Sequence, residues 1–163
     1  MNGKMNYVSN AKNIAEVILY LSGSCITPKK LQKLLYISYS MYLVLNNNSA
    51  YEKQNNRLFE NNFEAWAHGP VLPQIYAKYR EYGMNRINTS TTNIEQFGLK
   101  PETISFLGNI MSIFDKYQAH ELEEFTHKQS AWINARKGTD KFGICKTKIL
   151  DKDIYEDYCK YVS

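Results

Sequence analysis

Large apolar residues recur at helical spacing in several separate stretches of this 163-residue chain, and this periodicity limits the fold more than any other feature. The clearest stretch begins at Thr27-Pro28, where Thr27 can cap a helix and Pro28 suits its first turn. The sequence predicts a long helix from there to the polar run Asn46–Ser49. A similar stretch, Ser9–Leu21, precedes it and ends just before Gly23, a residue that favours helix ends.

The rest of the chain repeats this pattern in shorter segments. Further helices are predicted over residues 73–82, 101–117, 121–127, 131–136 and 151–161. Residues 59–65 alternate imperfectly between apolar and polar side chains, which indicates a short hairpin or extended segment. We expect Gly69-Pro70 to end any regular element before it, and residues 144–149 to form a small strand or a loop.

The predicted fold class is therefore mainly α. We expect a single compact domain over residues 1–163, with about five to seven helices and at most a short β-hairpin or roughly two to three short strands. Residues 84–98 are rich in Asn and Thr, with Ile87, Ile94 and Phe97 as isolated apolar anchors, and are expected to form a mobile loop. A composition of 44% hydrophobic and 22% charged residues is typical of globular proteins.

Charge and hydropathy narrow the setting in which the protein works. The net charge of +4 is thinly spread, and its densest basic spot, Lys29, Lys30 and Lys33, is interpreted as a solvated helix start. This argues against direct nucleic-acid binding, which usually needs a stronger patch. No apolar run is long enough to cross a bilayer, and the polar stretch Met1–Tyr7 does not resemble a secretory signal. We expect a cytoplasmic protein without membrane contacts.

The usual motifs of catalysis and metal binding are missing. Cys25, Cys145 and Cys159 lie far apart and form neither a disulfide framework nor a metal motif. His120-Glu121 begins like a zinc-protease helix, but Glu124 occupies the position that the second histidine would need. No phosphate-binding loop and no nucleophile motif is present either. The sequence therefore predicts neither an enzyme nor a metal or cofactor site.

One segment, Glu64–Pro73, is unusually dense in a tryptophan, a histidine, a glycine and two prolines. Its glycine and prolines indicate a rigid turn. One interpretation is a buried corner, with Trp66 plugging the core and His68 hydrogen-bonded to the backbone. The other is a surface that grips a partner protein, with catalysis as a third possibility.

Several motifs, in order, resemble those of one known family. The first half contributes Leu31-Gln32-Lys33-Leu34-Leu35-Tyr36, then Phe63-Glu64-Ala65-Trp66, then His68-Gly69-Pro70-Val71. The second half contributes Leu122, Phe125-Thr126-His127, and Ala131-Trp132 with Ala135-Arg136. Together they resemble the Panacea domain of the SocA-like antitoxin family over roughly residues 8–161. Two positions depart from the family, since Ala131 replaces a frequent proline and Leu72 a common valine.

The resemblance implies a mainly helical, non-enzymatic domain of phages, prophages and bacterial toxin–antitoxin pairs that binds and neutralises a toxin encoded beside it. Some such antitoxins are expected to pass the toxin to a host protease instead. No cofactor comes with the family. Two alternatives stay open: a phage or mobile-element protein that binds a host target, including a host defence complex, and a cryptic enzyme with a deep pocket joining Glu64, His68 and His127.

The residues that carry the resemblance are also the candidate site residues. The family positions are Leu31, Lys33, Leu34, Leu35, Tyr36, Glu64, Trp66, His68, Gly69, Pro70, Thr126, His127, Trp132 and Arg136. The favoured hypothesis is that the motif holds the shape while variable patches choose the partner, although motif residues could also form the interface. Candidate partner contacts are Tyr76, Tyr79, Trp132 and Arg136, because aromatic residues and arginine dominate the energetics of interfaces.

Overall fold

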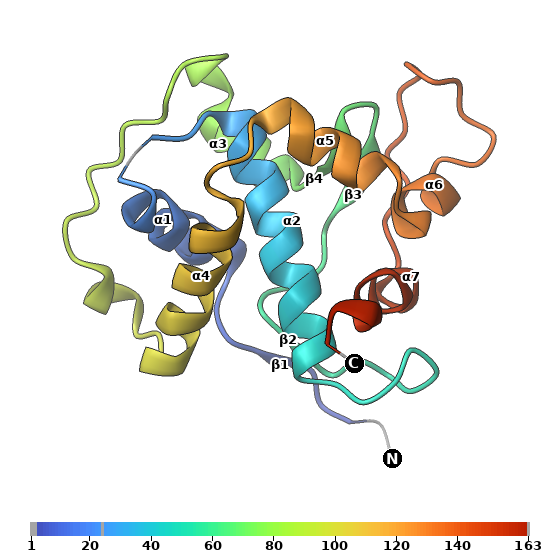
Figure 1. Cartoon of the computed structure of the whole chain (residues 1–163), viewed down its shortest axis with the longest axis horizontal. Helices are drawn as coiled ribbons and strands as arrows, with labels where there is room; N and C mark the ends of the chain where they lie inside the picture. Colours follow the sequence, from blue (N-terminus) through green and yellow to red (C-terminus); the bar gives the residue numbers. More distant parts are fainter. Residues whose placement is uncertain (1–2, 24, 163) are drawn as a thin grey trace.

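Helix α2 (Pro28–Leu45) runs through the middle of the molecule, and the other helices surround it (Figure 1). The computed structural model describes residues 3–23 and 25–162. Thr27 caps α2 through its side chain, and Pro28 stands in the first turn, as the sequence predicts. Every residue from Leu31 to Ser40 is buried, so α2 is covered on all faces rather than along one stripe.

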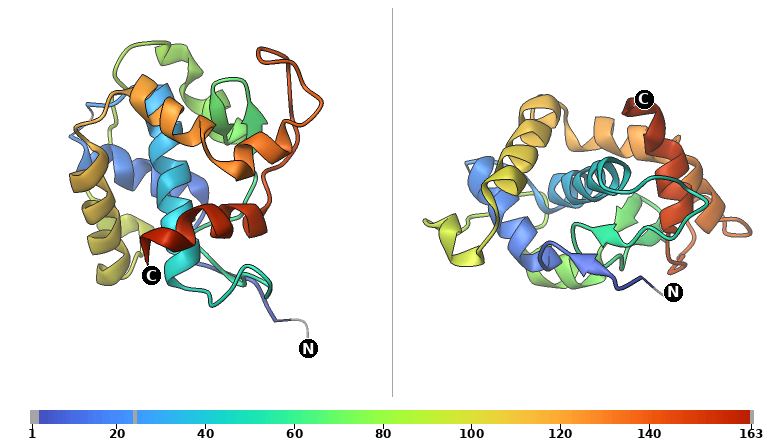
Figure 2. Two further views of the ribbon diagram at one scale, coloured as in Figure 1. Left: turned by 45° about the vertical axis from the view of Figure 1, so that its right-hand side comes forward. Right: turned by 90° about the horizontal axis from the view of Figure 1, so that it is seen from below.

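The mainly α fold class is confirmed, with seven α-helices in the described part of the chain. Besides α2 these are α1 (Ala11–Leu21), α3 (Pro73–Tyr79), α4 (Pro101–Phe114), α5 (Ala119–His127), α6 (Ser130–Ala135) and α7 (Asp151–Tyr158). Three short 3₁₀ turns complete the helical elements: η1 (Arg80–Tyr82), η2 (Ile94–Phe97) and η3 (Cys159–Tyr161). Helices α1 and α4 lie on one side of α2, and α6 and α7 lie on the other, while α5 crosses near its N-terminal end (Figures 1 and 2). No helix of the described residues has the length and apolar character to cross a membrane.

The strands are few and short. β1 (Asn6–Tyr7) pairs in parallel with β2 (Asn56–Arg57), and β3 (Glu64–Trp66) pairs antiparallel with β4 (Gly69–Val71). The prediction that Gly69-Pro70 ends a regular element is wrong, because these residues begin β4. Gly69 adopts φ +108°, a conformation that favours glycine, directly after the two-residue turn that closes the hairpin. The segment around Lys148 forms one isolated bridge to Glu64 on the outer side of β3, so residues 144–149 follow the loop alternative rather than a strand.

Helix α7 is tied to the centre by a carboxylate rather than capped by one. Leu150 occupies the cap position of α7, and Asp151 and Asp153 lie in its first turn. The Asp151 carboxylate instead forms an ion pair with Arg57 at 2.6 Å and accepts a hydrogen bond from Tyr39 Oη at 2.7 Å. The tyrosine ring itself packs into the core against Phe59 and Phe63.

Residues 84–98 are anchored to α1 by one side chain. Thr89 and Thr91 each donate a hydrogen bond to Glu16 Oε2 at 2.7 Å, and Tyr79 and Lys78 donate to Glu16 Oε1. Burial alone would raise the pKa of Glu16, but these hydrogen bonds outweigh it and lower the pKa to about 2. Ile87 of the same loop is fully buried, and its backbone N–H donates to the Ile26 carbonyl oxygen at 2.9 Å. The mobility of residues 84–98 stays a prediction.

Candidate functional site

The family positions, far apart in the sequence, meet around the β3–β4 hairpin. The hairpin packs on the N-terminal half of α2 through β4, and α5 closes over it (Figure 2). Leu31, Leu34, Leu35 and Tyr36 are fully buried on α2, and Gly69 and Pro70 are buried within the hairpin. This interior position supports the hypothesis that these residues hold the shape of the domain.

Lys33 is the least expected member of this cluster, because its side chain is buried with 1% of the residue exposed. The interpretation of the lysines near residue 30 as a solvated helix start is therefore wrong for Lys33. Burial lowers the pKa of its amine to about 7, although the neighbouring Glu123 carboxylate raises it. Sequence reasoning missed this burial because the carboxylate that faces the amine comes from α5, a helix remote in the chain.

Glu123 joins the charged groups above Lys33. It pairs with Lys29, and its Oε1 lies 2.9 Å from His68 Nδ1 and 3.8 Å from His127 Nε2. Burial raises the pKa of Glu123, but the hydrogen bonds from Lys29 and His68 outweigh it, so the net shift is downward. The prediction that the His68 side chain bonds to the backbone is wrong. This side chain is 70% exposed and bonds to the Glu123 carboxylate.

The side chain of Trp132, in α6, connects that helix to the hairpin at Trp66. Trp132 Nε1 donates to the Trp66 carbonyl oxygen at 2.8 Å, and the Trp132 ring stacks on His127 with 4.1 Å between centroids. Trp66 Nε1 donates to Glu64 Oε1 at 3.0 Å. Trp66 is only half-buried, so the expectation that it plugs the core is wrong. It covers the outer face of the hairpin, where Tyr76 packs on it edge-on.

The four candidate partner contacts separate by burial. Tyr79 and Arg136 are buried, with 5% and 6% exposed, so neither offers a surface to a partner. The Arg136 guanidinium instead donates to the carbonyl oxygens of Ala65 and Asp140, each at 2.8 Å. Tyr76 is 44% exposed and Trp132 is half-buried, so these two remain available.

The arrangement does not assemble the pocket that the enzyme alternative predicts. The concavity that reaches His68 is lined by neither Glu64 nor His127. Burial lowers the pKa of His127, whose ring stacks on Trp132 and whose side chain is 30% exposed. Among the residues that the structure describes, no group of three or more His, Cys, Asp and Glu side chains is placed to hold a metal ion.

Comparison with known proteins decides the family. The sequence model described as "Antitoxin SocA-like, Panacea domain" matches residues 31–133, more than half of the chain. This chain belongs to the SocA-like Panacea family of antitoxins. The match confirms the resemblance given by the motifs around Trp66 and Trp132. Searches of the curated proteins and of the solved structures found no significant match.

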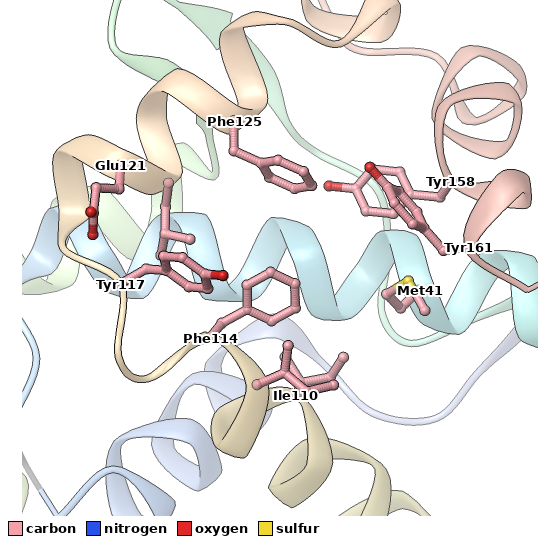
Figure 3. A pocket seen from close by; sticks show the side chains of 10 residues that line it. Met41, Ile110, Phe114, Tyr117, Glu121, Phe125, Tyr158 and Tyr161 are labelled. Carbon is pink, nitrogen blue, oxygen red and sulfur yellow. The ribbon is translucent and has the colours of Figure 1, made fainter.

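The Panacea positions do not account for a second, larger concavity than the one beside His68. A groove of about 550 Å³ lies over the middle of α2, between α4, α5 and the C-terminal η3 (Figure 3). We call it the aromatic groove. It is lined by Met41, Ile110, Ile113, Phe114, Tyr117, Glu121, Leu122, Phe125, Tyr158 and Tyr161. Figure 3 shows the rings of Phe114, Phe125 and Tyr158 grouped above α2.

The aromatic groove combines Panacea residues with residues beyond the matched stretch. Tyr158 and Tyr161 follow residue 133, whereas Ile113 and Tyr117 precede it. Ile113 and Tyr161 are 53% and 49% exposed, so the groove presents large side chains to solvent. Sequence reasoning missed this groove because its lining comes from separate elements, and because Tyr117 lies after α4 rather than in the helix predicted over residues 101–117.

Proposed function

We propose that this chain is a non-catalytic antitoxin that binds a toxin encoded beside it and blocks the toxin by direct contact. Membership of the SocA-like Panacea family supports an antitoxin-type role with a protein partner. The observation that carries direct binding is the aromatic groove, an exposed apolar concavity on a chain of only 163 residues. Large exposed apolar patches usually mark interaction sites.

The chemistry of the aromatic groove indicates what it binds. Five of its lining residues carry aromatic rings, the type of side chain that dominates binding energy at protein interfaces. Glu121 is the one charged residue of its lining, and its carboxylate already accepts a hydrogen bond from the backbone N–H of Gln118 at 2.6 Å. The groove therefore suits a protein partner that inserts large apolar side chains.

A growth assay with the two flanking genes tests the antitoxin role. Each neighbour is expressed alone and together with this chain, and growth and complex formation are measured. The proposal expects one neighbour to stop growth and this chain to restore growth through a stable complex. If neither neighbour is toxic, the proposal is overturned, and a host target becomes the question for a pull-down from host lysate.

A matched pair of variants tests the role of the groove in that assay. Ile113→Glu places a charge in the aromatic groove, whereas Leu45→Glu places one at the end of α2, outside it. Both parent side chains are 53% exposed, so both proteins should fold. We expect Ile113→Glu to weaken the complex at least tenfold, while Leu45→Glu still restores growth. Equal rescue by both variants would show that the toxin binds elsewhere.

A further inference from the structure

Residues 147–149 run antiparallel to β3 on the outside of the hairpin and are joined to it by a single β-bridge between Lys148 and Glu64. The backbone N–H of Ala65 donates to the Thr147 carbonyl oxygen, and the N–H of Ile149 donates to the Phe63 carbonyl oxygen, each at 3.0 Å. Lys148 lies opposite Glu64 between these two bonds. In such an antiparallel pair, the backbone groups of the opposed residues point away from each other. The N–H and C=O of Lys148 therefore point outward.

This outer edge has no cover in the described part of the chain. No described residue hydrogen-bonds to the backbone of Lys146 or Lys148. Residues 146–148 are all exposed, and Ile144 before them is 89% exposed. The α6–α7 connection that contains them runs along the outside of the molecule, far from α1 and α4 (Figure 1). An uncovered strand edge is a template for pairing with another chain.

The positive charge around this edge favours pairing with an acidic segment. The stretch 137–148 carries four lysines and one aspartate. Lys148 Nζ bonds to Asn62 Oδ1 at 3.1 Å, and Lys146 is exposed beside it. In a pairing of two copies through this edge, lysines would face lysines, which is unfavourable. A segment with acidic side chains would gain from the same arrangement.

An apolar cleft opens at one end of the edge. Its volume is about 340 Å³, and its lining includes Trp66, Val71, Phe142, Ile144 and Lys146. Phe142 is 77% exposed, so its ring is accessible to a bound segment. A large apolar side chain of a paired segment can occupy this cleft, while the segment's backbone continues along Lys146 and Lys148.

We propose that the outer edge of residues 144–148 binds an extended acidic segment of a partner protein by strand addition. The partner's backbone completes the hydrogen bonds of Lys148, its carboxylates face the lysines, and an apolar side chain enters the cleft beside Trp66. Main-chain bonds supply affinity in this binding mode, and the side-chain pockets supply specificity. The proposal concerns a surface separate from the aromatic groove and does not rest on the identity of the toxin.

A peptide experiment tests strand addition on the whole chain. The probe is a fluorescent peptide of about seven residues that alternates glutamate with valine. Two comparison peptides are used: one with lysine in place of glutamate, and one with alternate backbone amides N-methylated. Binding is measured by fluorescence anisotropy, and exchange of the Lys148 amide hydrogen is followed by NMR.

We expect the acidic peptide to bind at least tenfold tighter than either comparison peptide and to slow exchange of the Lys148 amide at least tenfold. Lys148→Pro should abolish this binding, because it removes the outward N–H and no internal backbone bond. Lys148→Ala loses the same side-chain bond to Asn62 but keeps the N–H, so it should retain part of the binding. Equal binding of the N-methylated peptide, or unchanged exchange at Lys148, would overturn strand addition. The flanking-gene assay tests the antitoxin role and the peptide experiment tests strand addition, so either proposal can fail while the other holds.

Discussion

Gly69 lies so close to Lys33 that a methyl group on its α-carbon would come within 2.6 Å of the lysine Nζ. The same methyl group would lie 3.0 Å from Thr126 Oγ1. The glycine of the hairpin, the buried lysine of α2 and the threonine of α5 therefore form one tightly packed contact. This contact brings together residues of three separated motifs.

The first prediction concerns this contact. Gly69→Ala should lower the free energy of unfolding by about 2–4 kcal/mol, because it adds a steric clash to the cost of φ +108° for a residue with a side chain. Urea denaturation measures the change. Gly98→Ala is the matched control, since Gly98 also has a positive φ but open space around it. Equal losses in both variants would show that the contact with Lys33 adds nothing.

The second prediction concerns the pH dependence that Lys33 creates. Burial lowers its pKa from 10.5 to about 7, so the unfolded chain binds more protons than the folded chain between these values. Stability contributed by this group therefore rises as pH increases from 7 towards 10.5, and no such slope exists below pH 7. Lys33→Met should reduce the slope and raise stability at neutral pH.

Urea denaturation between about pH 7 and pH 9.5 checks this prediction, below the range in which most tyrosines titrate. Lys53→Met, at an exposed position, is the control and should leave the slope unchanged. A slope that is the same in Lys33→Met and in the parent protein would contradict the account of the buried amine.

The third prediction concerns Glu16 and the loop 84–98. The folded-state pKa of Glu16 is about 2, below its ordinary value of 4.5. Its contribution to stability is therefore complete above pH 4.5 and is lost as pH falls towards 2. Glu16→Gln should reduce the loss of stability between pH 4.5 and pH 2 and speed amide hydrogen exchange in residues 84–98. Unchanged exchange at Thr89 and Thr91 would mean that other contacts hold the loop.

The fourth prediction concerns Arg136. Its guanidinium donates to the carbonyl oxygens of Ala65, Asp140 and Gly143, so its loss removes three hydrogen bonds, including the one to the buried Ala65. Arg136→Met should destabilise the fold by about 3 kcal/mol or more. Thermal unfolding measures this, with exposed Lys137→Met as the neighbouring control. A loss below about 1 kcal/mol would contradict the anchoring role.

Local signals in the sequence were sufficient for the helices. The start of α2 at Thr27-Pro28 depends on one cap and one proline, both of which act within a single turn. The hairpin was only half predicted, because Gly69-Pro70 resembles a terminator unless a partner strand is known. The pairing of Trp66 with Gly69 supplies that partner.

The site was harder to predict than the fold, because its chemistry depends on contacts between distant segments. Lys33 is buried only because Glu123 and the hairpin cover it, and Arg136 is buried only because the Asp140–Gly143 turn wraps around it. The motif residues were found by resemblance, whereas the aromatic groove and the exposed edge of residues 144–148 carry no local signature. These two surfaces arise from the packing of separate elements.

The measurement that tests the central claim most directly is hydrogen–deuterium exchange of this chain with and without the purified toxic neighbour. Direct neutralisation through the aromatic groove predicts a stable complex in which exchange slows in the last turns of α4, in α5 and in η3. A complex that leaves these segments unchanged, or growth rescue without any complex, would contradict it.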